Sequence, residues 1–224
     1  MTDSPLIEAK SISKRFGALA ALTDVDLAIR SGEVLALLGD NGAGKSTFIK
    51  VLSGAHPQSD GELLMDGKPV SLSSPQDAAD LGIATIFQEL ALSENLSIAE
   101  NVFLGRELTH RFLGVPLLRR AAMKRRVKEL LEELDAHISD PEAPVGALSG
   151  GQRQAVAICR ALNLNARLVI MDEPTAALAV AETRKVLQLT RRLADSGRAV
   201  VLISHNMHDV FEVADRIVVF RRGR

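Results

Sequence analysis

The sequence predicts an α/β fold with a mostly parallel sheet, an N-terminal antiparallel β subdomain and an inserted α-helical subdomain. Three observations predict it. Short apolar runs recur along the chain, helix-compatible runs separate them, and the stretch after Gln88 has few strand-like runs and mostly helical patterns. Strands that alternate with helices form parallel sheets covered on both faces. The 224 residues are 46% hydrophobic and 25% charged, which suits a globular protein with a sizeable core.

The first part of the chain is expected to form strands joined by turns. Residues 6–16 and 23–30 alternate partly between apolar and polar side chains, and a turn at Gly17 joins them. Residues 34–38 are a nearly continuous apolar run, which is typical of a buried parallel strand. Residues 61–66 should form a further short strand before an Asp-Gly turn.

Helices are expected next to these strands. Residues 45–53 follow a glycine-rich loop, and residues 75–81 begin on a proline with Ser73 or Ser74 as the cap. An apolar strand follows at residues 83–87.

The stretch after Gln88 is expected to be an inserted helical subdomain. It holds few strand-like runs, and residues 97–104 and 121–134 are helical in pattern. The boundaries that we expect are an insertion at approximately residues 89–164 and a core at residues 1–88 and 165–224.

A basic cluster precedes and enters the second of these helices. Acidic residues follow it at once and no aromatic residues interleave, so we interpret it as a solvated face. The net charge of −1 gives no support for a nucleic-acid binder, and no nucleic-acid partner is expected. The cluster consists of Arg119, Arg120, Lys124, Arg125 and Arg126.

The last part of the chain returns to alternating strands and helices. Residues 167–171 and 199–203 are buried strands, a long amphipathic helix at residues 180–196 lies between them, and residues 217–220 form the last strand. The arginine-rich end, residues 221–224, looks like a turn into a further strand, so we expect a C-terminal tail to be missing.

Composition also bears on the compartment. No run approaches 18 apolar residues, so no membrane span is expected, and residues 1–10 lack the apolar region of a secretory signal. The single cysteine, Cys159, rules out an internal disulfide, fits a reducing compartment and is expected to be a buried helical side chain.

One stretch carries most of the functional information. Residues 39–46 fit the pattern G-x-x-x-x-G-K-[ST], with a strand before them and a helix after them. The glycines let successive N–H groups point at a phosphate, and the helix adds its positive end. Lys45 would reach the β- and γ-phosphates, and the Ser46 hydroxyl would bind Mg²⁺. The sequence therefore predicts a P-loop NTPase core.

Two further motifs narrow the class of nucleotide enzyme. Residues 148–152, Leu-Ser-Gly-Gly-Gln, open a helix that should run to about Asn163 and offer a second phosphate-binding helix start, although an ordinary helix cap would look the same. Residues 168–173 end a buried strand in two carboxylates. Asp172 would hold the Mg²⁺ shell, and Glu173 would orient or deprotonate the attacking water.

Two polar residues stand just after other predicted strands. His205 could donate a hydrogen bond to a γ-phosphate oxygen, because its strand follows the one that carries Asp172. Gln88 could bind Mg²⁺ and position water, although a polar loop residue is the usual explanation of such a side chain.

These motifs, in this order and spacing, resemble the nucleotide-binding subunits of ABC transporters over nearly the whole chain. Residues 148–152, the signature motif, separate this family from other P-loop ATPases. The resemblance implies that the signature motif of one subunit closes over the ATP bound by another, in a head-to-tail dimer with a second copy or a paralogue. It also implies that Phe16 stacks on adenine.

The site residues that the resemblance implies are as follows. The nucleotide would be bound by Phe16, Gly39, Asn41, Gly42, Ala43, Gly44, Lys45, Ser46 and Thr47, and across the dimer by Ser149, Gly150, Gly151 and Gln152. Mg²⁺ would be bound by Ser46, Gln88 and Asp172. The catalytic residues would be Glu173, His205, Gln88 and Lys45.

Residues 83–90 and 96–107 look like the ATPases of bacterial monosaccharide importers of the ribose, xylose and fructose types. This implies integral-membrane permease partners, an indirect link to a periplasmic sugar-binding protein, and a peripheral position on the cytoplasmic face of the inner membrane.

The sequence departs from the family pattern at Ala179, where the family commonly has an Asp in a loop that couples the two sites.

Two alternatives stay open. A soluble ABC ATPase acting in DNA repair or translation would use the same catalytic residues, but the stretch between Gln88 and Leu148 has no long heptad-rich arm and no net basic excess. A P-loop small-molecule kinase is disfavoured by the signature motif, and no second substrate site is evident.

Overall fold

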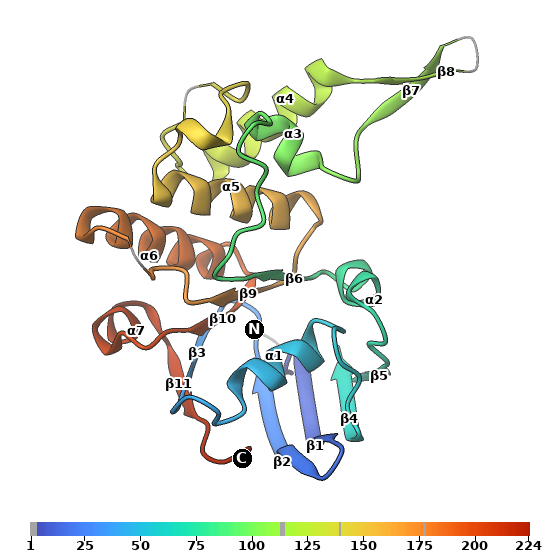
Figure 1. Ribbon diagram of the computed structural model, residues 1–224, viewed down its shortest axis with the longest axis vertical. Helices are drawn as coiled ribbons and strands as arrows, with labels where there is room; N and C mark the ends of the chain where they lie inside the picture. Colours follow the sequence, from blue (N-terminus) through green and yellow to red (C-terminus); the bar gives the residue numbers. More distant parts are fainter. Residues whose placement is uncertain (1–3, 113–114, 139, 177) are drawn as a thin grey trace.

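The computed structural model describes residues 4–112, 115–138, 140–176 and 178–224. Residues 1–3, part of the segment that lacks a secretory signal, and Ala177, four residues after Glu173, lie outside these ranges. The fold is α/β with one parallel and one antiparallel sheet, which confirms the predicted class (Figure 1).

A five-stranded parallel sheet forms the centre of the molecule. Its strands are joined in parallel register throughout, as the apolar runs predict. All five were expected from the sequence, and no end of any strand differs from its predicted bound by more than one residue. In spatial order they are β11 (Arg216–Val219), β3 (Val34–Leu38), β10 (Ala199–Ile203), β9 (Leu168–Asp172) and β6 (Ile83–Ile86).

A four-stranded antiparallel sheet packs below it in Figure 1. The strand predicted at residues 23–30 begins earlier, at Leu19, because the turn after Phe16 is tight. A three-residue strand was not predicted, since it is short and contains Pro69, which argues against a strand. The order is β2 (Leu19–Ile29), β1 (Ile7–Phe16), β4 (Asp60–Met65) and β5 (Lys68–Val70).

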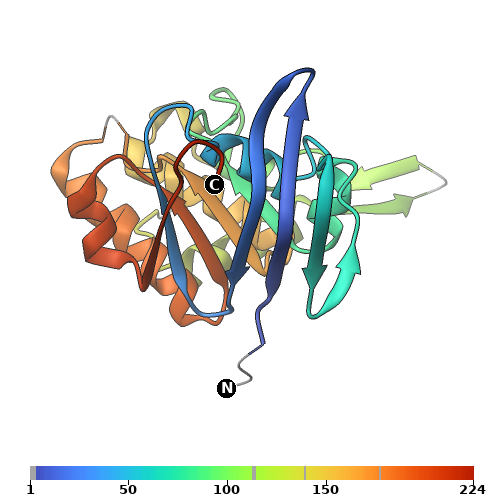
Figure 2. The same ribbon diagram turned by 90° about the horizontal axis from the view of Figure 1, so that it is seen from below.

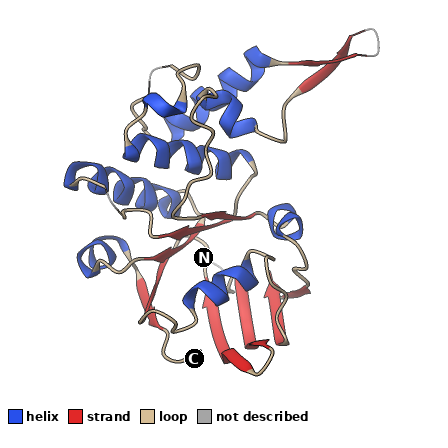
Figure 3. Cartoon of the chain, in the orientation of Figure 1, coloured by secondary structure: helices blue, strands red, loops and turns tan. Residues whose placement is uncertain are grey.

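Helices cover both faces of the parallel sheet (Figure 3). Helix α1 (Lys45–Leu52) lies between the two sheets, while α5 (Gly150–Asn163) and α6 (Val180–Asp195) cover the opposite face. Helix α2 (Pro75–Asp80) is capped by Ser74. Helix α7 (Met207–Val213) was not predicted, although its Asn206 cap and the acid in its first turn are start signals.

The core divides according to the two faces of the parallel sheet. In β9, Leu168 and Ile170 pack on the α1 side, whereas Val169 and Met171 pack against α5 and α6. Every one of these four side chains is at 0% exposure, because alternate residues of a strand point to opposite faces that are both covered. This rigid double-sided packing fixes the strand ends that carry the site. Cys159 is buried on α5, as expected.

The inserted region contains more than helices. It holds α3 (Ile98–Phe103) and α4 (Arg120–Glu133), but also a hairpin of β7 (Thr109–Phe112) and β8 (Val115–Leu118). The predicted helical insertion therefore also carries a hairpin that the sequence did not predict. The strands are too short for a readable alternation, and Pro116 argues against a strand. A short 3-10 helix, η1 (Val145–Ala147), precedes the signature motif.

Within the described residues, no helix has the length and apolar character needed to cross a membrane.

Candidate nucleotide site

Three neighbouring strands of the parallel sheet end at the same edge. Strands β3, β10 and β9 lie side by side, and they are followed by the P-loop (residues 39–46), by His205 and by Glu173 respectively. A cavity of about 560 Å³ opens at this edge, and we call it the nucleotide cavity. Its size is typical of a site for a small molecule. The predicted residues that line it are Phe16, residues 41–47, Gln88, Asp172, Glu173 and His205.

The P-loop needs glycine for steric reasons at two positions. Gly39 has φ of 138°, and a Cβ there would lie 2.3 Å from the carbonyl oxygen of Phe220. Gly44 has φ of 111°, and its Cβ would lie 3.0 Å from the side chain of Leu22. The β11 end and β2 therefore press against the loop from both sides, and the loop backbone is fixed with its cradle facing the cavity.

Lys45 supplies a buried positive charge inside the loop. Its side chain is 6% exposed, and its Nζ donates hydrogen bonds to the carbonyl oxygens of Gly39 at 2.5 Å and Asp40 at 3.1 Å. No carboxylate lies within 4.0 Å of this ammonium among the described residues. A buried cation without an anionic partner is costly. The loop therefore fits an anionic ligand such as a triphosphate.

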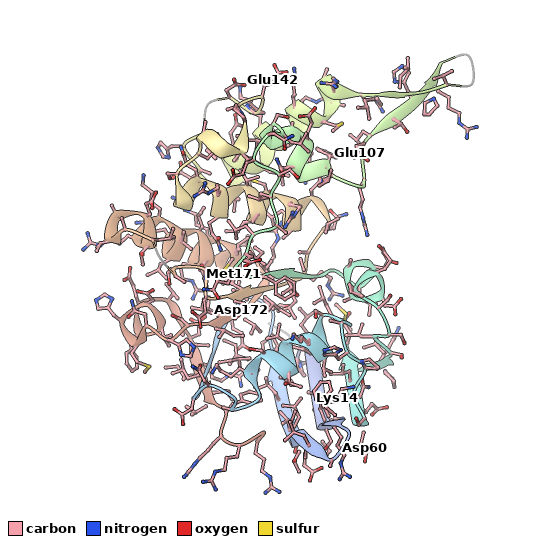
Figure 4. All side chains as sticks on the ribbon, viewed as in Figure 1. Lys14, Asp60, Glu107, Glu142, Met171 and Asp172 are labelled. Atoms are coloured by element: carbon pink, nitrogen blue, oxygen red, sulfur yellow. The ribbon has the colours of Figure 1, made fainter. Side chains whose placement is uncertain are left out.

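Asp172 and Glu173 end β9 near the middle of the molecule, where Figure 4 labels Met171 and Asp172. Burial, and then the charge of Glu173, raise the pKa of Asp172. The backbone of Glu173 has φ of 50°, and its N–H donates to the carbonyl oxygen of Ile203 at 2.9 Å. The Nε2 of His205 lies 2.8 Å from the Oε1 of Glu173. The two side chains thus form one polar pair at the cavity.

The side chains that could donate to a metal at the cavity suit Mg²⁺ better than a metal held entirely by protein side chains. No group of three or more His, Cys, Asp or Glu side chains that could hold a metal is present in the described part of the chain. Mg²⁺ is usually bound by one or two carboxylates together with waters and substrate phosphates. Ser46, Gln88 and Asp172 offer a hydroxyl, an amide and a carboxylate at the same cavity, which is that kind of set.

Phe16 lies at the mouth of the cavity, at the end of β1. Its ring is 43% exposed, and it meets the His56 ring edge to face at a centroid distance of 5.4 Å. The Nζ of Lys14 lies 5.2 Å from the ring centre. A ring held by its neighbours but still half-open can stack on a flat base.

The signature motif lies away from the nucleotide cavity. Ser149 caps α5, accepting a hydrogen bond from the N–H of Gln152 at 3.4 Å, while the Gln152 side chain accepts from the N–H of Ser149 at 3.0 Å. Ser149, Gly151 and Gln152 line a second cavity of about 330 Å³ between α5 and α6. Gly150 lines a third cavity, which also reaches Gln88 and Glu173. One chain therefore does not bring together the two helix starts that were predicted to bind phosphate.

Glu182 of α6 packs against the signature motif, and sequence reasoning missed it. A Cβ on Gly151 would lie 3.4 Å from the Cβ of Glu182. A hydrogen bond from the Ser149 side chain is the main reason that the pKa of Glu182 is lowered. The clue in the sequence is the spacing of Glu182 from Ala179, which is the spacing of a helix capping box.

Two further residues at the nucleotide cavity were not predicted. Arg222 and Gly223 line it, although they lie in the last turn of the chain. The N–H of Gly223 donates to the carbonyl oxygen of Ala43 at 2.8 Å, and the N–H of Thr23 donates to the carbonyl oxygen of Gly223 at 2.8 Å. The sequence shows the turn, but only the placement of β11 beside β3 brings it to the P-loop.

Asp209 is a buried acid behind the pair formed by Glu173 and His205, and the sequence analysis did not identify it. It is 3% exposed and accepts hydrogen bonds from the Thr175 hydroxyl at 2.7 Å and the Asn206 amide at 2.9 Å. Thr175 stands two residues after Glu173, and Asn206 follows His205. Asp209 therefore connects the two loops that carry the pair.

The fold and this site define a P-loop ATPase of the ABC class. The family model described as ABC transporter matches residues 22–176, so the chain belongs to the ABC transporter family. It is an ATP-binding cassette that hydrolyses ATP.

Its curated relatives include import ATP-binding proteins. The chain is 50% identical to the xylose/arabinose import ATP-binding protein of Sulfolobus acidocaldarius, covering 99% of this chain and 86% of the relative. It is 47% identical to the fructose import ATP-binding protein of Rhizobium meliloti, covering 100% and 88%. A ribose import ATP-binding protein of Rubrobacter xylanophilus is 49% identical over 98% of this chain, which spans only 43% of that longer protein.

Solved structures agree with this assignment. A nucleotide-free ATP-binding cassette from an ABC transporter superposes with a TM-score of 0.82 at 27% identity, over 97% of this chain and 88% of the other. A dimeric cassette bound to ADP and phosphate in a post-hydrolysis state has a TM-score of 0.76 at 26% identity, over 97% and 95%.

Proposed function

We propose that this chain is the ATP-hydrolysing subunit of an importer for a monosaccharide. The observation that carries the ATPase role is the gathering of Lys45, Glu173 and His205 at one cavity, with the signature motif left outside it. The names of the relatives, which import xylose or arabinose, fructose and ribose, support a monosaccharide as the transported solute.

In this proposal the chain binds Mg-ATP through the residues that line the nucleotide cavity. Phe16 stacks on adenine, while the P-loop N–H groups and Lys45 bind the phosphates. Ser46, Gln88 and Asp172 hold Mg²⁺, which would neutralise charge that develops on the phosphates. The raised pKa of Asp172 means that protons compete with the ion more strongly than at an ordinary carboxylate, so acid is expected to weaken this set.

Glu173 and His205 are proposed to act on the γ-phosphate. Glu173 orients the attacking water and accepts its proton, and His205 donates toward the phosphate oxygens. Their 2.8 Å contact holds each side chain in place before the nucleotide arrives. Asp209 supports both loops from behind through Thr175 and Asn206.

A second copy or a paralogue is proposed to complete the site. The helix start at Ser149, Gly150, Gly151 and Gln152 would offer N–H groups to an anion, but within its own chain it lies on other cavities. A head-to-tail pair would bring it over the ATP of the partner and exclude water there. The side chain and the backbone N–H of Gln152 both bond to Ser149 in the cap of α5, so a phosphate would have to replace the longer of these bonds, the one from the Gln152 N–H at 3.4 Å.

The permease is proposed to dock in an apolar groove of about 200 Å³ between α2, β6 and α5, which we call the docking groove. Phe87 is 45% exposed there, and the buried hydroxyl of Thr85 has no hydrogen-bond partner in the described residues. Arg160, on the same groove, donates to the carbonyl oxygens of Leu90 and Ala91 at 2.8 and 2.9 Å. A shift of the segment just after Gln88 would therefore reach the groove through Arg160.

In this proposal the chain would be a peripheral subunit on the cytoplasmic face of the inner membrane. The sugar would be selected by the permease and by a periplasmic binding protein.

The proposed ATP-dependent dimer of two chains is tested with the Glu173→Gln variant. Its mass in solution is measured by light scattering with and without Mg-ATP. An ATP-dependent change from monomer to dimer supports the proposal, because hydrolysis no longer separates the pair. The same chain with Ser149→Arg should stay monomeric while still binding ATP. A monomer under all conditions, in a chain that binds ATP, would contradict a composite site formed by this chain with itself.

Transport is tested in cells that lack the chain. Uptake of radiolabelled pentoses and hexoses should be lost, restored by the native chain, and not restored by Lys45→Ala. Unchanged uptake of every monosaccharide in the panel would contradict sugar import.

A further inference from the structure

The β7–β8 hairpin takes no part in the nucleotide site and carries exposed apolar side chains. It extends away from α3 and α4 as a two-stranded ribbon (Figures 1 and 2). Val115, Leu117 and Leu118 are 58%, 43% and 44% exposed. Apolar side chains that gather on an exposed projection mark an interaction site, since isolated ones are the normal case on a protein surface.

The register of the hairpin puts apolar groups on both of its faces. His110 lies opposite Leu117, and Arg111 lies opposite Pro116. Because alternate residues point to opposite faces, Val115 and Leu117 share one face, and Leu118 shares the other with Arg111. A ribbon with apolar groups on both faces has no single face to lay against a flat protein surface. It suits an apolar medium that surrounds it.

The charge around the hairpin indicates an anionic partner. Residues 108–126 hold six Arg and Lys side chains and no Asp or Glu. Three are matched by acids outside this stretch: Arg120 by Glu100, Lys124 by Glu142, and Arg126 by Glu129 on the same helix. The other three have no acid within 4.0 Å among the described residues, and they are Arg111, Arg119 and Arg125.

The hairpin leaves the molecule on the side of the docking groove. Both the hairpin and α2 stand on the right of Figure 1. Arg106, just before the hairpin, lies 3.8 Å from Asp80 at the end of α2, and α2 forms one wall of the groove. A membrane protein in the groove would therefore place the bilayer near the hairpin.

We propose that the β7–β8 hairpin inserts its apolar side chains into the surface of an anionic lipid bilayer, where its unmatched arginines bind the lipid phosphates. The orientation beside a permease rests on the proposed function, whereas lipid binding itself does not. Apolar groups flanked by Arg and Lys bind membrane interfaces, and each basic residue near the surface strengthens binding by about 1 kcal/mol, which is roughly fivefold.

The test is co-sedimentation of the purified chain with sucrose-loaded vesicles, either of phosphatidylcholine alone or with a third of phosphatidylglycerol. The native chain should bind the anionic vesicles and release them at high salt. Arg111→Gln with Arg119→Gln should weaken binding by about twentyfold, and Val115→Ser with Leu117→Ser by about tenfold or more. The matched controls, Arg30→Gln and Val219→Ser, change an exposed arginine and an exposed valine elsewhere and should bind as the native chain does.

Each variant is also checked for ATP binding, which reports folding and tests the nucleotide site separately. Failure of the native chain to bind anionic vesicles would overturn the proposal, and so would hairpin variants that bind them as well as the native chain. If hairpin variants instead lost assembly with the permease in lipid-free detergent, without loss of vesicle binding, the partner would be the protein and the lipid proposal would be wrong.

Discussion

The Nε2 of His205 lies 2.8 Å from the Oε1 of Glu173, across the gap between two neighbouring strands. The pairing of Ile203 with Asp172 in the parallel register sets this distance, because it makes the two strands end level with each other. The position of the pair therefore depends on the register of the sheet as well as on the contacts that Asp209 makes with both loops. A change in one member is expected to affect the other.

Glu173→Gln is predicted to keep ATP binding but to lower turnover by about 10²-fold or more, the scale of a lost general base. The amide can still contact His205, so the site should stay folded. Steady-state phosphate release and nucleotide binding measure the two effects. Glu212→Gln is the control, since this carboxylate lies on α7, 3.8 Å from His208 and outside the nucleotide cavity. Near-normal turnover in Glu173→Gln would remove Glu173 as the base.

Asp172→Asn is predicted to stabilise the nucleotide-free chain while weakening its response to Mg²⁺. The raised pKa means that the folded chain disfavours the charged carboxylate. That penalty is present at neutral pH, and it disappears as the pH falls through the raised pKa and the carboxyl takes up a proton. Urea unfolding at about pH 7 should show a gain on the order of 1 kcal/mol, a typical result of relieving such a site.

The gain for Asp172→Asn should shrink in acid, while the extra stability that Mg²⁺ gives in the presence of ATP should be largely lost. Glu62→Gln, which removes an exposed charge on β4, is the matched control. An unchanged Mg²⁺ response would show that Asp172 is not part of the metal site.

Ala179 is the cap residue of α6 and makes no side-chain cap hydrogen bond. Ala179→Thr should raise the free energy of unfolding by about 1 kcal/mol, because its hydroxyl would complete a capping box with Glu182. Ala179→Asp supplies the same cap and also the acid that the family commonly has at this position. Both substitutions should raise the unfolding midpoint in urea, but only Ala179→Asp should change the cooperativity of ATP hydrolysis. If both variants hydrolysed ATP with the same cooperativity, an acid at position 179 would have no role in coupling the two sites.

Arg167 and Asp66 join the end of the antiparallel sheet to the start of β9. The guanidinium donates two hydrogen bonds to the carboxylate, at 2.7 and 2.8 Å, and this lowers the pKa of Asp66 below its ordinary value of 3.8. The stabilisation is therefore complete above the ordinary pKa and is lost as the pH falls through the lowered one. Both side chains are about half exposed, so solvent screens the pair.

Asp66→Asn should lower the free energy of unfolding by up to about 1 kcal/mol at pH 7, and the difference from the native chain should vanish in strong acid. Asn tolerates the φ of 51° at this position, so backbone strain does not confuse the result. Unfolding in urea at the two pH values measures it. A difference that persists in acid would point to the backbone and not to the ion pair.

The parts of the site that depend on local sequence were predictable, and the parts that depend on strand neighbours were less so. The P-loop was predicted because its glycines, Lys45 and Ser46 are consecutive, so one motif contains the whole cradle. That β9 and β10 are adjacent followed from their order along the chain. Arg222 could not be found in this way, because its place at the cavity requires β11 to lie beside β3, on the far side from β10.

The fold shows the same division. Continuous apolar runs such as β3 and β10 are easily recognised as strands in the sequence. They are buried on both faces, so no polar residue interrupts the run. The hairpin was missed because its stability comes from cross-strand pairing of two four-residue segments, which leaves no periodic signal. The short β5 was missed for the same reason.

Arg222→Gln is predicted to weaken ATP binding by about three- to fivefold at low salt, as expected for the loss of one exposed cation near a triphosphate. The turn is held against the P-loop by Gly223, so the side chain at position 222 stays at the cavity without the nucleotide. Arg222 has φ of 50°, and a Gln there has the same backbone cost, so the backbone does not contribute to the difference.

Arg221→Gln is the control, because it removes an equal charge from the same turn at a residue that does not line the cavity. Calorimetric titration with ATP should show the loss only in the first variant, and high salt should abolish the difference. Equal losses in the two variants would mean that the turn acts through its overall charge and that Arg222 makes no contact with the nucleotide.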